Sequence, residues 1–236
     1  MIMKHSLIAL AALALASCGD YLTPDGEIVE CDMEIPTDVK GIEIADGMKL
    51  NLSDDVPAGT AVVRTHLNIQ SYIKAEIEGD RLVFSVDARR FKDLDVTITT
   101  SPASYSSFTA SGGSRISSSE PFTASEAAIT LSGGSHASLA ATCNTMAIDC
   151  SGGSELTLKG TCDNADINCS GGSHCYAYGF TTAKAVVNIS GGSGLEITAT
   201  ESLTGDNSGG SRIRYKGTPA LLNINNSGGS TTVPAE

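Results

Sequence analysis

The chain has 236 residues, with 27 Asp and Glu against 15 Lys and Arg, and carries a formal net charge of −12 at pH 7. Nucleic-acid recognition needs clustered Lys and Arg, so this acidic balance excludes the nucleic-acid-binding classes. Trp is absent and aromatic residues make up 5%, which is poor material for a globular core of large side chains, whereas the abundant Ser, Thr, Val, Ile and Gly suit short strands and tight turns.

The first residues predict export and a lipid anchor. Lys4 precedes an apolar run from Leu7 to Ala16 that is too short for a membrane-spanning helix. The run leads into Leu15-Ala16-Ser17-Cys18, which resembles a bacterial lipobox. This resemblance implies a signal peptide over residues 1–17, acylation of Cys18 and attachment to the outer membrane. An ordinary cleaved signal peptide with an incidental cysteine is the alternative.

Residues 18–36 are expected to form an acylated tether. Several acids follow Cys18 closely, namely Asp20, Asp25, Glu27 and Glu30. They fit either a signal for export to the cell surface or a solvated linker. The sequence therefore leaves open whether the protein faces the cell surface or the periplasm.

Residues 37–105 are predicted to form a β-rich N-terminal portion. Leu94–Thr99 alternates apolar and polar residues, as a half-buried strand does. No stretch here has a helical stripe. Two pairs of strand-like segments surround turn residues, namely Gly41–Ile44 with Met48–Leu52 around Asp46-Gly47, and Ile73–Glu78 with Arg81–Val86 around Gly79-Asp80.

From Ser111 onward the tetrapeptide SGGS recurs at nearly constant pitch. Its seven copies begin at Ser111, Ser132, Ser151, Ser170, Ser190, Ser208 and Ser227, in steps of 18 to 21 residues. Units this small cannot bury an apolar face alone, so they must stack on their neighbours. Aligned on SGGS, apolar residues fall into columns, with Ile116, Ala137, Leu156, Cys175, Leu195 and Ile213 after the motif and Ile129, Ile148, Ile167 and Val187 before the next copy.

The alternation predicts two short strands per repeat, joined by turns. Stacked at about 4.8 Å, they give an all-β fold: a right-handed parallel β-helix, or single-stranded solenoid, over residues 106–236, with the N-terminal portion packed on it or continuous with it. SGGS supplies the corners, because glycine reaches positive φ without steric cost and lets backbones approach closely. The predicted corner glycines are Gly112, Gly113, Gly133, Gly134, Gly152, Gly153, Gly171, Gly172, Gly191, Gly192, Gly209, Gly210, Gly228 and Gly229.

Three segments, followed by the serial SGGS coils, carry a family resemblance. They are VKGIEIADGMKLNLS (Val39–Ser53), IKAEIEGDRLVFSV (Ile73–Val86) and LDVTITT (Leu94–Thr100). In this order they make the chain resemble the putative auto-transporter adhesin, head GIN domain family, which is common among exported proteins of Bacteroidetes-type bacteria. The resemblance implies a β-helical exported domain, and it brings no catalytic residues to carry over.

One outward column places His136, Glu155 and His174 in consecutive coils, about 4.8 Å apart. Imidazole and carboxylate groups are ligands that Zn²⁺ accepts, so this column is a candidate metal site. An exposed ladder of charges is the alternative, favoured because an open face lacks groups to orient the histidines. We predict no cofactor.

Four cysteines stack in pairs. Cys143 and Cys162 are 19 residues apart, as are Cys150 and Cys169. Export permits disulfides, and a coil spacing of about 4.8 Å allows them. Parallel side chains hold the Cβ atoms slightly too far apart, which favours free thiols that pack as small hydrophobes. Stacked thiols and coil-to-coil disulfides both stay open.

A further outward row holds Asp149, Asn168, Asn188, Asp206 and Asn225. Stacked amides predict a ladder of side-chain hydrogen bonds, while a calcium site is the alternative, although the glycine-rich calcium-binding repeat is missing. Catalysis is not expected, because no nucleophile elbow occurs and coils this short leave little room for the loops of a cleft. Asp166 beside Asp149 is the remaining candidate carboxylate pair.

The sequence thus predicts a non-catalytic cell-envelope lipoprotein, an adhesin-like binding or structural module. It would be held to the membrane by its N-terminal lipid and would have a glycan or protein ligand. A β-helical glycan-active enzyme is one alternative. A self-associating envelope scaffold is another, since an open strand edge at the last coil invites pairing into a homo-oligomer.

Overall fold

The structure is a computed structural model that describes residues 21–88, 90–118 and 120–235. The predicted signal peptide and Cys18 lie outside the described residues. Within them the chain is almost entirely β structure. Its elements are β1 Ile28–Glu34, β2 Gly41–Ile44, β3 Lys49–Leu52, β4 Thr60–His66, α1 Leu67–Gln70, β5 Ile73–Glu78, β6 Arg81–Val86, β7 Val96–Thr100, a 3₁₀ turn Pro102–Ser104, β8 Ser107–Ala110, β9 Arg115–Ser118, β10 Phe122–Leu131, β11 His136–Cys150, β12 Glu155–Cys169, β13 His174–Ile189, β14 Gly194–Asn207, β15 Arg212–Lys216, β16 Leu221–Asn226 and β17 Thr231–Pro234.

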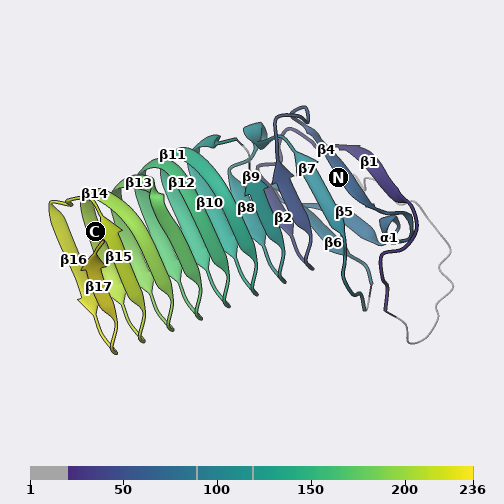
Figure 1. Cartoon of the computed structure of the whole chain (residues 1–236). Helices are drawn as coiled ribbons and strands as arrows, with labels where there is room; N and C mark the ends of the chain where they lie inside the picture. Colours follow the sequence, from purple (N-terminus) through teal and green to yellow (C-terminus); the bar gives the residue numbers. More distant parts are fainter. Residues whose placement is uncertain (1–20, 89, 119, 236) are drawn as a thin grey trace.

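The repeats form a β-solenoid whose coils lie side by side along a rod (Figure 1). Strands β10 to β14 pair in parallel with their neighbours, one coil against the next. The β11–β12 register joins positions 19 residues apart, such as His136 with Glu155 and Cys150 with Cys169. The predicted parallel β-helix is therefore confirmed.

The coils of β11, β12, β13 and β14 are each one long bent strand, whereas β9 with β10 and β15 with β16 form coils of two shorter strands. β11 pairs with β12 on both sides of a bend near Asn144, where the inward–outward alternation slips by one residue. The residues before the bend build one sheet and the residues after it build a second sheet. Because the pairing runs on through the bend, only the SGGS corner interrupts the strand. The prediction of two separate segments per repeat is therefore corrected for the four middle coils, and it holds for the coils of β9 with β10 and of β15 with β16.

The N-terminal portion is continuous with the solenoid. β2 pairs in parallel with β8, and β3 pairs in parallel with β9. The two strands around Asp46-Gly47 are therefore not paired with each other; they separate into the two sheets and make the first coil. Both strands bury their apolar residues in the same interior, which places them on opposite walls of the rod.

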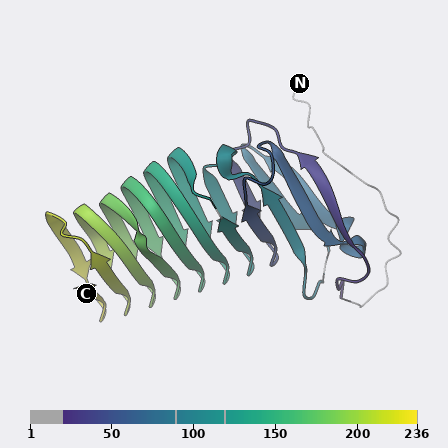
Figure 2. The same ribbon diagram turned by 45° about the horizontal axis from the view of Figure 1, so that its top comes forward.

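Antiparallel strands close the N-terminal end. β6 extends one sheet from β2 and pairs with β5, while β7, β4 and β1 extend the other sheet from β3. The predicted hairpin around Gly79-Asp80 is confirmed, since Glu78 pairs with Arg81. Figure 2 shows these strands at the end of the rod opposite the last coil.

One helical turn was missed in the N-terminal portion, where no helical stripe is present. α1 spans four residues, too few for periodicity to reveal, and its Ile69 is fully buried. No helix within the described ranges has the length and apolar character needed to cross a membrane.

A single apolar core runs the length of the rod. The inward columns predicted from the repeat are buried, including Ile148, Ile167 and Val187, which are fully inaccessible to solvent. The same core continues into the first coil through Ile44 and Leu50. At the other end an asparagine, Asn207, takes the column position of Ile189, so the interior becomes polar toward the last coil.

Candidate functional site

The SGGS bends stack into one line. In each copy both glycines have positive φ, for example +61° and +75° at Gly152 and Gly153. The N–H of Gly153 donates to the carbonyl of Gly171 in the next coil at 3.1 Å, and Gly134 donates likewise to Gly152 at 3.0 Å. Asp46 and Gly47 make the same bend in the first coil, with φ of +62° and +78°.

The last serine is buried in the first six copies and half-buried in the seventh, at Ser230. Ser135 donates its hydroxyl proton toward the carbonyls of Ser132 at 2.8 Å and Ala110 at 2.9 Å, and accepts from the N–H of Ser132 at 3.1 Å. Ser173 similarly donates to the carbonyl of Cys150 at 2.9 Å. These hydroxyls satisfy backbone groups within the corner, which gives the last serine of the motif a structural role.

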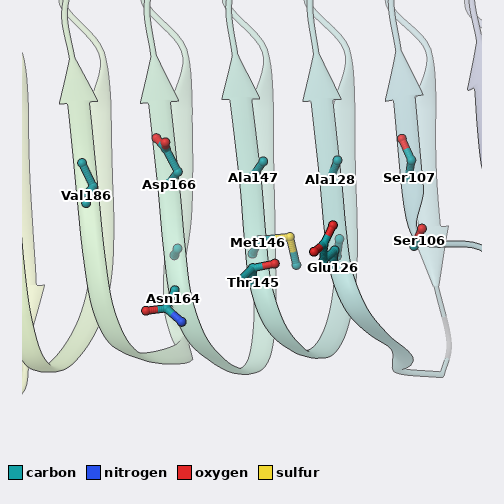
Figure 3. Close-up of a pocket in the computed structure, with 12 residues that line it drawn as sticks. Ser106, Ser107, Glu126, Ala128, Thr145, Met146, Ala147, Asn164, Asp166 and Val186 are labelled. Atoms are coloured by element: carbon teal, nitrogen blue, oxygen red, sulfur yellow. The ribbon is translucent and has the colours of Figure 1, made fainter.

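The outer face of the second sheet, which carries β8 and β16, is hollowed. A groove of about 530 Å³ crosses β8, β10, β11, β12 and β13 (Figure 3). The outward column Ser107, Ala128, Ala147 runs along it with short side chains, and ends at Asp166 and Val186. Beside this column lie the longer Glu126, Thr145 and Asn164.

The groove was missed from the sequence. Ala128 and Ala147 are small residues at outward positions of alternating strands, so they do not stand out in the sequence. The signal in the sequence is a column of short outward side chains beside a column of longer polar ones, which indicates a groove.

The row of Asp and Asn residues forms the predicted ladder. Asn168 donates to Asp149 at 3.0 Å, Asn188 donates to Asn168 at 3.1 Å, and Asn225 donates to Asp206 at 3.1 Å. The row lies two residues further along each strand than the groove column, at the next outward position. Asp149 therefore serves as a hydrogen-bond acceptor for Asn168.

The structure brings His136, Glu155 and His174 into one column through direct register partners. Their side chains do not converge. The ring of His174 lies over the next coil, where a Cβ built on Gly194 would stand 2.8 Å from its Cδ2 atom, and it stacks on Tyr176 with ring centroids 6.0 Å apart. Among the described residues no cluster of three or more His, Cys, Asp or Glu is arranged to hold a metal ion.

The stacked cysteines are register partners and are free thiols in this structure. Burial raises the pKa of Cys143 to about 12, and a hydrogen bond with Cys162 adds to the rise. The hydrogen bond with Cys169, followed by burial, raises the pKa of Cys150 far above its ordinary value. These thiols are held in their neutral form and pack as parts of the core.

Comparisons with known proteins agree with this architecture. Residues 38–219 match the family model described as "Putative auto-transporter adhesin, head GIN domain". A structure described as a putative adhesin from Bacteroides fragilis aligns with a TM-score of 0.79 at 19% identity, over 91% of this chain and 100% of that chain. A putative adhesin from Parabacteroides merdae aligns with a TM-score of 0.65 at 16% identity, over 92% and 100%.

A structure described as a putative lipid binding protein from Parabacteroides distasonis aligns with a TM-score of 0.68 at 17% identity, over 92% of this chain and 100% of that chain. At these identities the structural matches establish the fold. No curated protein matches the chain. Since the family model covers most of the sequence, the chain belongs to the putative auto-transporter adhesin, head GIN domain family, whose description is that of an exported envelope protein.

Proposed function

We propose that this protein is an envelope lipoprotein, acylated at Cys18 and held to the outer membrane, whose solenoid is a non-catalytic, adhesin-like binding module. The observation that carries the proposal is the groove along Ala128 and Ala147, bordered by hydrogen-bonding side chains from successive coils. An adhesin family assignment supports the same role.

The groove suits an extended ligand. Thr145 and Asn164 are register partners, so their polar groups recur at the coil spacing of about 4.8 Å. Glu126 and Asp166 add acceptors on β10 and β12. A linear glycan, which offers hydroxyl groups at regular intervals, can bond to such a row while its apolar ring faces lie on the two alanines.

The spacing of the carboxylates favours binding over hydrolysis. Glu126 and Asp166 lie on β10 and β12, with β11 between them. Their backbones lie two coil spacings, about 10 Å, apart along the rod, and Asp166 lies two residues along the strand from Asn164, which shares the column of Glu126. The paired carboxyl groups of glycosidases lie about 5 to 9.5 Å apart, on side chains placed to face each other across the scissile bond. Asp149, the other candidate, is engaged by Asn168.

A panel of neutral and charged polysaccharides tests the proposal. We expect a panel member to bind the protein without release of reducing ends, and Ala147→Trp to weaken that binding at least tenfold by filling the groove. Ser138→Trp is the matched control, because Ser138 lies outward on the same strand in the other sheet. Release of reducing ends would support the glycan-active enzyme instead, and equal binding by both tryptophan variants would remove the groove from the proposal.

The anchor is tested separately in cells. Cys18→Ala should remove the protein from the outer-membrane fraction, because the variant lacks the thiol that would carry the acyl chains holding it there. Protease treatment of intact cells then distinguishes the two orientations. Degradation of the wild type would support display at the cell surface, and protection would support the periplasmic face. An unchanged membrane fraction for Cys18→Ala would contradict acylation at this cysteine.

Self-association is a second candidate role, favoured by the last coil. Leu221 and Leu222 of β16 are 54% and 45% exposed, and Val233 of β17 is also exposed. Apolar side chains beside an open strand edge favour pairing with a second copy. Light scattering at high concentration should then give a mass above that of a monomer for the wild type and a monomeric mass for Leu222→Lys. A monomeric wild type would contradict this role.

A further inference from the structure

Three positive charges of this acidic protein lie together on one strand, β15. β15 reads Arg-Ile-Arg-Tyr-Lys, and its alternation places Arg212, Arg214 and Lys216 on the outer face while Ile213 is fully buried. From Asn207 to Ala235 the sequence has no Asp or Glu. In a chain with a net charge of −12, this coil is therefore a local reversal of sign.

Two tyrosine rings lie near these cations on β13, which is separated from β15 by β14. Tyr176 is a register partner of Glu196, which is in turn the partner of Arg214. Tyr176 is 38% exposed, and its ring stacks on His174 at an interplanar angle of 21°. Lys216 places its Nζ atom 4.9 Å from the ring centroid of Tyr178. The outer face of β13 to β15 thus combines flat rings with cationic groups.

The two arginines are available for an external anion. Among the described residues, neither Arg212 nor Arg214 takes part in an ion pair, whereas Arg64 and Arg81 pair with glutamates. Glu196 is the register partner of Arg214. Glu155 is in the same column as Arg212 but three coils away from it. Both arginines are exposed, and their Cα atoms are separated by two residues of extended strand, about 6.7 Å.

We propose that the outer face of β13, β14 and β15 binds an acidic polysaccharide that carries carboxylate groups. Arginine recognises carboxylates through paired N–H donors, and exposed tyrosine rings supply an apolar surface for sugar rings. The inference rests on the proposed binding role of the solenoid, but it uses residues of the other sheet rather than the groove. It assigns that role a ligand of defined charge.

Polygalacturonate, a polymer of uronic acid, is the probe, with a neutral galactan, polyphosphate and phosphatidylglycerol vesicles as comparisons. Titration calorimetry on the full chain should show binding to polygalacturonate that weakens as salt rises. The double variant Arg212→Gln/Arg214→Gln should weaken it at least tenfold. Tyr176→Ala should weaken it several-fold, while Tyr176→Phe should keep it.

Lys49→Gln/Arg115→Gln is the matched control. Lys49 and Arg115 are exposed register partners in the same outward column as Arg212 but at the other end of the rod, and their removal changes the net charge equally. Binding unaffected by this control and lost in the arginine variant supports the proposal. Equal losses in both, or equal affinity for polyphosphate or the vesicles, would overturn it.

The two binding proposals fail separately. If polygalacturonate does not bind, while another polysaccharide binds in a manner sensitive to Ala147→Trp, the acidic-glycan inference is wrong and the groove proposal stands. If polygalacturonate binding survives Ala147→Trp and is lost in the arginine variant, the cationic face is supported on its own.

Discussion

Two glycines stand in every SGGS bend, and they differ in what a side chain would meet. A Cβ on Gly152 would stand 3.1 Å from the backbone N of Gly133 in the preceding coil, whereas a Cβ on Gly153 would meet nothing within 4 Å. Both residues have positive φ, so both carry the conformational preference for glycine. Only the first also carries the packing constraint that brings coil against coil.

The two positions should therefore respond unequally to alanine. We expect Gly153→Ala to cost about 1 kcal/mol of unfolding free energy from the left-handed backbone alone. Gly152→Ala should cost about 2 to 3 kcal/mol, because the stacked bend must also move apart. Urea denaturation measures both changes. Equal costs would show that close stacking of the bends does not constrain this corner.

Gly160 is a more severe case, outside the SGGS motif. It has φ of +112°, and a Cβ there would stand 1.9 Å from the carbonyl oxygen of Ala141. Gly205 repeats this geometry against Val187. Gly160→Ala should lower the free energy of unfolding by more than about 3 kcal/mol, and in the extreme case no soluble protein is obtained. Gly153→Ala is the reference variant. A melting temperature equal to that of Gly153→Ala would contradict this expectation.

The buried thiols predict a pH dependence. The folded chain raises the pKa of Cys143 from 9.0 to about 12, so it favours the neutral thiol. Below about pH 9 the thiol is neutral in both folded and unfolded chains, and its contribution to stability is fully present. As pH rises from about 9 toward 12 the unfolded chain loses this proton first, and stability falls.

Urea midpoints measured from pH 8 to pH 11 should therefore decrease, and the decrease should be smaller in Cys143→Val. Alkylation gives a second readout at one pH. Cys31, which is partly exposed, should react with iodoacetamide at pH 8 well before Cys143 and Cys150. Rapid modification of Cys143 and Cys150 in the folded protein would contradict their neutral, packed state.

At the scale of elements, the coil is the unit that the sequence predicts well. The inward columns, the corners and the Asp/Asn ladder follow from the period and the alternation, because a stacked strand repeats its neighbour's environment. The first coil was harder to predict from the sequence. Asp46-Gly47 replaces SGGS there, so the bend is recognised from its positive φ angles and from the stacking of Gly112 on Asp46.

Side-chain directions were the least predictable part. His136, Glu155 and His174 do share a column, yet the missing side chain of Gly194 leaves room for His174 to lean away from Glu155. Register fixes which residues are neighbours, whereas rotamers depend on local vacancies that the alignment does not show. The groove has the same origin, in the small size of Ala128 and Ala147.

Since each coil contacts mainly its two neighbours, a whole coil should be removable. Deletion of residues 151–169 brings β11 against β13 and keeps the SGGS line intact, because the deleted segment equals one step of the repeat. We expect this variant to stay folded and to lose stability in proportion to one coil interface.

Deletion of residues 151–160 is the contrasting variant. It removes about half a coil, so the remaining half would place inward residues of one sheet against the other sheet. Circular dichroism should show a β spectrum with a cooperative transition for the first deletion and an unfolded chain for the second. Similar behaviour of the two variants would contradict the coil as the structural unit.

At the scale of the whole molecule, the two ends of the rod differ. The first coil is closed by β1, β4, β5, β6 and β7 together with α1, and the sheets continue into them without a break. The last coil carries β15 with its cations and β16 with its exposed leucines. One continuous core thus presents a groove on one sheet and a cationic, aromatic face on the other.

The coils stack in register along a rod, and both binding surfaces are built from columns of register partners. Distances between nitroxide labels at Ser111→Cys, Ser170→Cys and Ser227→Cys, measured pairwise by pulsed electron resonance in a Cys31→Ser background, test this stacking most directly. The first and second labels are three coils apart and the first and third are six, so the backbone separations should be about 14 Å and about 29 Å. A distance that fails to double over the second three coils would contradict the account.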